Sequence, residues 1–131
     1  MNNYFTYSVL EYKHSLGLGE SLNVGILFYF PEENIFEFVN GDGFRAKTIY
    51  PDFNISLFNA YLKVINSKVK HLLVLLNEKP VDSDFAKFIH NYILAVDASG
   101  LIFREPVQVK NIFSDRKTVV NEFSNLLLPE I

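Results

Sequence analysis

The stretch from Glu20 to Phe30 (ESLNVGILFYF) constrains the fold of this chain more than any other, and it predicts a central β-strand. β-Branched and aromatic residues dominate it, as a packed and pleated surface favours. Alternation places Leu22, Val24, Ile26, Phe28 and Phe30 on one face and Ser21, Asn23, Gly25, Leu27 and Tyr29 on the other. The first face is apolar throughout, so helices or another layer have to cover it, whereas the second begins with small and polar residues.

Gly25 is the anomaly in this strand. A glycine inside a strand weakens it and marks a bulge or a close approach of backbone or ligand. Because Gly25 lies two residues from Asn23, we expect a small notch beside an amide that can both donate and accept hydrogen bonds. In the alternative interpretation, Asn23 caps a turn, Gly25 is a bulge and Glu20 is solvated.

The composition indicates a single domain over 1–131 with a large core, since 49% of the residues are hydrophobic and 13 are Phe. A net charge of −3 without a basic run argues against nucleic-acid binding. The absence of cysteine excludes disulfides, thiol catalysis and cysteine-based zinc sites. No secretion signal opens the chain, and no apolar run approaches the roughly 20 residues of a membrane span. We therefore expect a cytoplasmic protein.

Three strands are expected first, over 4–13, 20–30 and 35–39, and they would form an antiparallel meander. A loop at 14–19 and a turn at 31–34 would connect them. Asp42 is expected to cap a short helix over 44–50, which has to end near Pro51.

Helices dominate the second half of the chain. Apolar residues recur every three or four positions over 55–76, which predicts one long helix, although 71–76 alone is also compatible with a buried strand. A second helix is expected from a cap at Asp82 or Ser83 to Val96. Leu101–Phe103 and Val107–Lys110 should form one extended edge segment interrupted by Pro106. Ser114 should cap a last helix that carries Val119, Val120, Phe123, Leu126 and Leu127.

This order of elements predicts an α+β fold. A small, mainly antiparallel sheet, made of the N-terminal three-stranded meander and a late strand, would pack against three or four helices on one face.

Few residues are arranged for catalysis. His14, in a loop, and His71 and His90, in different helices, share no metal-ligand spacing, and no Gly-x-Ser-x-Gly elbow is present. The glycines before Glu20 lead into a strand, so no helix N-terminus is available there to hold a phosphate. We therefore expect no metal and no cofactor. The carboxylates of Glu20, Asp42 and Asp52 lie at element ends, and their convergence on a hard cation stays open.

Two blocks in the first half of the chain resemble a known bacterial family. Tyr7-Ser-Val-Leu-Glu-Tyr12 and Gly19-Glu-Ser-Leu-Asn-Val-Gly-Ile-Leu-Phe28 are similar to the opening of domain of unknown function 3037, and Arg45 with Pro51 and Asp52 resembles its next segment. Gly100, Pro106 and the last helix resemble its end. The resemblance implies no catalytic residues. Since some members occur beside HipA-type kinases, it implies a protein partner.

The leading hypothesis is a small accessory or binding module that acts through protein–protein contact, with a kinase-type or defence-system protein as the candidate partner. Its functional face would carry Glu20, Asn23, Gly25, Arg45 and Asp52. Arg45 would pair with Glu20 or Asp52, or recognise an acidic group on the partner. The alternative is a metal-assisted hydrolase or nuclease that uses Glu20, Asp42 and Asp52. Self-association through the last helix is a third interpretation.

Overall fold

The computed structural model of the protein describes residues 4–15, 20–31, 33–41, 43–75, 87–89, 93, 100–110 and 115–128. Its strands are β1 (Tyr4–Ser15), β2 (Glu20–Phe30), β3 (Ile35–Asn40), β4 (Leu101–Phe103) and β5 (Val107–Lys110). Its helices are α1 (Phe44–Ile49), α2 (Ile55–Leu75) and α4 (Arg116–Leu127), and residues 87–89 are also helical. The strands form one sheet in the order β3-β2-β1-β4, with β5 also paired to β1, and every pairing is antiparallel. The α+β class and the N-terminal meander are thus confirmed.

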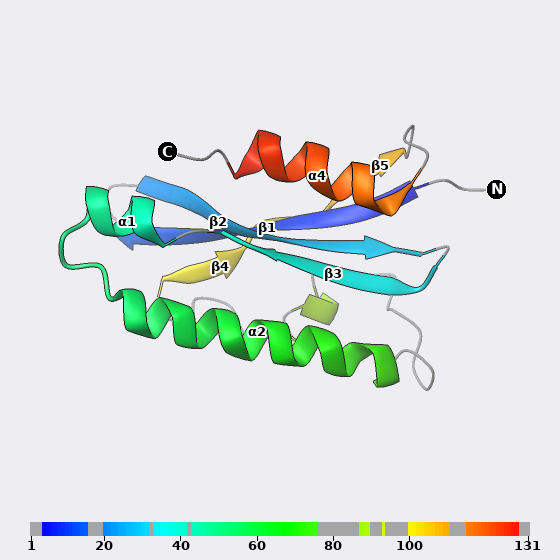
Figure 1. The fold of residues 1–131 in the computed structure, drawn as a ribbon, viewed down its shortest axis with the longest axis horizontal. Coiled ribbons are helices and arrows are strands. Elements are labelled where there is room, and N and C mark those ends of the chain that lie inside the picture. Colours follow the sequence, from blue (N-terminus) through cyan, green and yellow to red (C-terminus); the bar gives the residue numbers. More distant parts are fainter. Residues whose placement is uncertain are drawn as a thin grey trace.

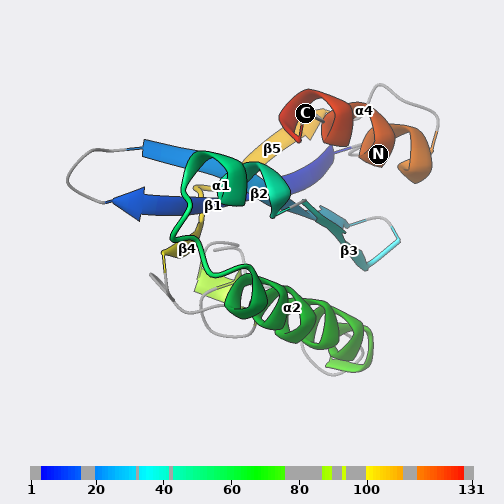
Figure 2. The ribbon, with the colours of Figure 1, turned by 60° about the vertical axis from the view of Figure 1, so that its left-hand side comes forward.

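The helices cover both faces of this sheet, so the expectation of a single helical face is wrong. α2 runs along one face and α4 lies across the other (Figure 1), and the turned view separates them in the same way (Figure 2). Each helix has a core of its own. The α2-side core contains Leu10, Val24, Leu27, Phe58 and Ile65 among others. The α4-side core contains Phe5, Ile26, Phe28, Phe30, Val119 and Val120.

A bulge in β2 explains why both faces are apolar. Leu10 of β1 pairs with Gly25, whereas the next residue, Glu11, pairs with Asn23, so Val24 is an extra residue in β2. One extra residue reverses which face the following side chains occupy. Val24 therefore packs in the α2-side core, while Ile26 packs in the α4-side core. The single apolar face predicted for β2 is wrong for this reason.

The bulge also sets which face of the sheet the polar side chains at the start of β2 occupy. Ser21 hydrogen-bonds to Glu11 of β1 and Asn23 hydrogen-bonds to the end of α4. Both side chains therefore share a face with Ile26 and Phe28, which lie under α4. The α4 side of the sheet is apolar at one end of β2 and polar at the other.

The long helix α2 is confirmed, including residues 71–75, which are helical rather than extended. Asn54 begins it, because its side-chain oxygen accepts a hydrogen bond from the Leu57 amide at 2.9 Å. α1 follows Gly43 and has no side-chain cap, and it ends at Tyr50, just before Pro51. Asp42, the expected cap, lies outside the described residues.

Two other helices meet their predictions in part. Of the helix expected between Asp82 or Ser83 and Val96, the structure describes helical residues 87–89 and residue 93, and the caps lie outside the described part. Phe88, Ile89 and Ile93 are buried in the α2-side core, as their spacing predicted. α4 is capped by Asp115, whose carboxylate accepts a hydrogen bond from the Thr118 amide at 2.7 Å, so the Ser114 cap is wrong.

The late extended segment is confirmed as an interrupted edge strand. β4 pairs with residues 10–12 of β1 and β5 pairs with residues 4–7, on the side of β1 away from β2. The chain leaves the ladder between them, where Pro106 has no amide hydrogen to donate. Buried Ser8 donates a hydrogen bond to the Arg104 carbonyl there at 2.7 Å. His14 belongs to β1 rather than to the predicted loop.

Candidate functional site

The α4 side of the sheet is only partly covered, and the uncovered part is a groove. α4 has 12 residues and is therefore about 18 Å long, whereas the 12 residues of β1 extend for about 40 Å. Beyond the end of α4 lies a groove of about 490 Å³, within the size range of ligand sites. We call it the α4-face groove. It is lined by Tyr7, Val9, Glu11, Lys13, Ile102, Phe103, Arg104, Glu105, Val107 and Leu127.

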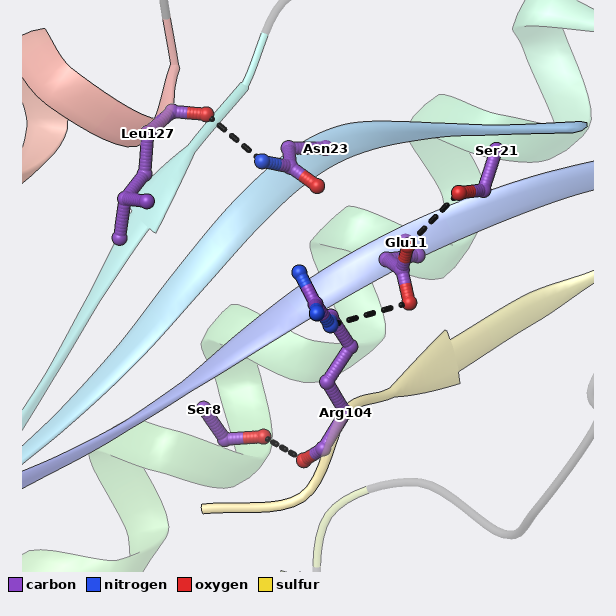
Figure 3. A network of polar contacts seen from close by, with 6 residues as sticks. All are labelled: Ser8, Glu11, Ser21, Asn23, Arg104 and Leu127. Atoms are coloured by element: carbon purple, nitrogen blue, oxygen red, sulfur yellow. Dashed lines mark hydrogen bonds and ion pairs between the residues drawn. The ribbon is translucent and has the colours of Figure 1, made fainter. Parts of the chain in front are cut away.

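Two of the groove's lining residues, Glu11 and Arg104, form a polar cluster with neighbouring Ser21. Figure 3 shows the contacts of this cluster. The Ser21 hydroxyl donates to Glu11 Oε2 at 2.7 Å, and Arg104 Nε lies 3.4 Å from Glu11 Oε1. The Glu11 side chain is only 12% exposed, whereas the Arg104 side chain is 56% exposed. A nearly buried carboxylate therefore positions a guanidinium group that remains open to the groove.

This arrangement is suited to anion recognition. Arg104 uses Nε for Glu11, and no described residue accepts a hydrogen bond from its two terminal nitrogens. A planar guanidinium with free terminal N–H groups matches the two oxygens of a carboxylate. Lys13 and Glu105 also line the groove, so its described charged residues comprise two acids and two bases.

Asn23, a predicted site residue, borders this region but has a structural partner. Its side chain is exposed, and Nδ2 donates to the Leu127 carbonyl at 3.0 Å. The last carbonyls of a helix lack partners within the helix. Asn23 therefore satisfies one of them and fastens the end of α4 to β2, rather than capping a turn as the alternative interpretation expected.

The notch predicted beside Gly25 does not exist. A Cβ atom on Gly25 would lie 2.7 Å from Cζ of Phe38, so the ring of Phe38 fills this space. Phe38 packs against the α2-side core, whereas Asn23 contacts α4 on the opposite face. Gly25 thus allows close packing between β2 and β3 next to the bulge.

The remaining predicted site residues do not join Asn23 in one described cluster. Asp52 is exposed in the turn after α1, and together with Tyr12 and Phe58 it lines a second cavity on the α2 side. Glu20 is the first residue of β2 and Arg45 lies in α1, and the side chains of both are outside the described set. No group of three or more His, Cys, Asp or Glu side chains that could hold a metal occurs among the described residues.

Glu11, Ser21 and Arg104 were not predicted as a site. One signal was available for Glu11, because alternation along β1 places it on the same face as Phe5, Tyr7 and Val9. A charged residue that continues an apolar face is expected to pair with another polar or charged side chain. The partner itself is 93 residues away in the chain, and the sequence gives no register for β4 against β1.

Comparison of the chain with family models, curated proteins and solved structures finds no match. None of the helices in the described part of the chain is long and apolar enough to cross a membrane.

Proposed function

We propose that this protein is a small binding module and that the α4-face groove holds an extended segment of a protein partner. The observation that carries the proposal is the open guanidinium group of Arg104, positioned by nearly buried Glu11 within a groove of about 490 Å³. An oriented cation beside apolar side chains provides a specific contact together with apolar area.

The dimensions of the groove favour an extended peptide. It follows β1 from Tyr7 to Lys13, a length of about 20 Å, which is enough for about six residues of extended chain. Its apolar lining includes Val9, Ile102 and Val107. Alternate side chains of an extended segment would contact this lining, while the others face solvent.

The charges of the groove favour a peptide over a nucleic acid. Glu11 and Glu105 balance Lys13 and Arg104, so the described lining has no excess of positive charge for a phosphate backbone. A single carboxylate on the partner would pair with Arg104. We thus propose for Arg104 the acid-recognising role that the sequence suggested for Arg45. The resemblance to domain of unknown function 3037 also supports a protein partner, because some members occur beside HipA-type kinases.

Site-specific photo-crosslinking tests the proposal. A photoreactive amino acid is placed at Val107, which lines the groove and is 44% exposed, or at Val64 on α2, which is 47% exposed. The two positions match in residue type and exposure but lie on different sides of the sheet. We expect a partner protein to be crosslinked in cells from Val107 and not from Val64.

The variant Arg104→Ala provides the second part of the test. Loss of a charge-assisted hydrogen bond costs about 1.5–3 kcal/mol, so crosslinking from Val107 should weaken roughly tenfold or more. Arg104→Ala also removes the cation beside the nearly buried Glu11 carboxylate, so some loss of stability is expected, and crosslinking is compared well below the melting temperature of both proteins. Equal crosslinking from both positions, or a Val107 crosslink that Arg104→Ala leaves unchanged, would contradict the proposed binding groove.

A further inference from the structure

The strand β3 ends in a chemically labile pair of residues, Asn40 and Gly41. An asparagine followed by glycine is prone to deamidation, because the glycine has no side chain to hinder attack of its nitrogen on the asparagine amide. This is the only Asn-Gly pair in the sequence. Asn40 is exposed, so water reaches it, and neither residue lines the α4-face groove. The pair is therefore a candidate modification site separate from the proposed binding surface.

The fold itself requires the glycine of this pair. Gly41 lies so close to the bulged residue of β2 that an added Cβ atom would be 2.3 Å from the Val24 carbonyl oxygen and 2.5 Å from the carbonyl carbon. Both atoms belong to the backbone, so a side chain at this position would have to displace the strand. The close packing of β3 on the bulge thus selects, at position 41, the residue type that makes Asn40 most reactive.

Two hydrogen bonds hold the reacting groups of the pair away from each other. The Gly41 nitrogen, which is the attacking atom, donates to the Val24 carbonyl at 2.8 Å. The Asn40 side-chain oxygen Oδ1 accepts from Nδ2 of Asn66, on α2, at 2.7 Å. Asn66 Nδ2 also donates to the Leu62 carbonyl at 2.8 Å. Because a carbonyl oxygen only accepts, this second bond fixes the orientation of the Asn66 amide, and Asn40 has to present its oxygen.

We propose that Asn40 is a site of spontaneous deamidation, and that these two hydrogen bonds restrict the reaction to molecules in which the end of β3 has opened. In the open state the Gly41 nitrogen attacks Cγ of Asn40. The N–Cγ bond forms, the Cγ–Nδ2 bond breaks, and ammonia leaves with the proton of the Gly41 nitrogen. Water then opens the cyclic imide at either carbonyl, which yields aspartate or isoaspartate. Strand ends open locally at a lower free energy than the whole domain, so the reaction does not require global unfolding.

The isoaspartate product does not fit the native end of β3. Its main chain passes through the former side chain, which inserts an additional carbon between Asn40 and Gly41. The Gly41 nitrogen is then displaced from the Val24 carbonyl, in a place where the backbones of β2 and β3 leave no spare room. Each opening of this strand end therefore carries a chance of a permanent change, and the modified fraction of the protein records how often β3 has opened.

Peptide mass spectrometry of the full chain tests the site and its protection. The protein is incubated at neutral pH, either folded or unfolded in urea, and the conversion of the Asn40 amide to a carboxylate is followed over time. We expect the folded chain to react at least roughly tenfold more slowly, since opening has to break both hydrogen bonds. Equal rates in the two conditions, or no reaction at Asn40 in the unfolded chain, would overturn the proposal.

Two matched variants of α2 test the role of Asn66. Asn66→Ala removes the donor to Asn40, whereas Asn59→Ala changes an exposed asparagine on the same helix. Alanine favours a helix, so both variants should remain folded. Asn66→Ala should speed deamidation of Asn40 roughly fivefold, the effect of losing one neutral hydrogen bond, and Asn59→Ala should keep the wild-type rate. Equal rates in the two variants would refute protection by Asn66.

Discussion

The substitution Ser8→Ala tests how the sheet tolerates the break between β4 and β5. Ser8 is fully buried, and its hydroxyl donates to the Arg104 carbonyl at 2.7 Å. The Arg104 amide is satisfied separately, since it donates to the Val9 carbonyl at 2.8 Å. Removing the Ser8 hydroxyl therefore leaves one carbonyl at the break without its described donor.

The expected loss of stability follows from this geometry. Leaving a buried polar group unsatisfied costs about 1–3 kcal/mol, and we expect about 2 kcal/mol for Ser8→Ala. An unfolding entropy of about 2.1 cal/mol/K per residue over 131 residues gives about 0.28 kcal/mol/K. The melting temperature should therefore fall by about 7 °C. Urea denaturation should show a lower midpoint with an unchanged m-value.

Ser21→Ala is the matched control. Ser21 also makes one side-chain hydrogen bond, to Glu11, but it is exposed. Water replaces the lost partner there, so the free energy of unfolding should change by about 0.5 kcal/mol or less. If Ser8→Ala destabilises the protein no more than Ser21→Ala, the buried hydroxyl does not support the break.

Four further substitutions test other local features. Gly41→Ala should destabilise by about 2 kcal/mol or more, because its Cβ would lie 2.3 Å from a backbone oxygen of β2. Gly25→Ala should lower the free energy of unfolding by less than Gly41→Ala, since the ring of Phe38 can shift. A larger loss for Gly25→Ala than for Gly41→Ala in urea denaturation would refute the bulge packing. Asn23→Ala should speed hydrogen exchange in the last turn of α4, and unchanged exchange would remove its capping role. Asp115→Ala should lower the melting temperature at neutral pH, because hydrogen bonds from Thr118 hold the pKa of Asp115 below its ordinary 3.8. This stabilisation is complete above pH 3.8 and is lost as the pH falls through the lower folded-state pKa, so the difference between wild type and variant should disappear in acid.

Most elements of the fold are predictable from local patterns in the sequence. Three- and four-residue spacing predicts α2, and the interruption at Pro106 predicts the split between β4 and β5. Local sequence patterns are less informative at helix ends. Ser114 and Asp115 are adjacent, and either residue type can cap the N-terminus of α4. Only the structure shows that the carboxylate of Asp115 accepts the Thr118 amide.

The placement of side chains on the two faces is not predictable in the same way. Strict alternation through β2 gives one apolar face, but the extra residue at Val24 transfers Ile26 and Phe28 to the face of α4. A glycine signals a bulge without giving its register. The pairing of Glu11 with Arg104 depends on the register of β1 with β4, which tertiary packing sets.

NMR shift mapping can show whether the uncovered part of the α4 side is the binding surface. The probe is a peptide selected by phage display against the purified full chain. We expect the perturbed amides to gather along Val9 to Lys13 and Ile102 to Val107, and Arg104→Ala to weaken binding roughly tenfold. Perturbations confined to the outer surface of α2, around Leu57 and Val64, with binding unaffected by Arg104→Ala, would contradict the proposed binding surface.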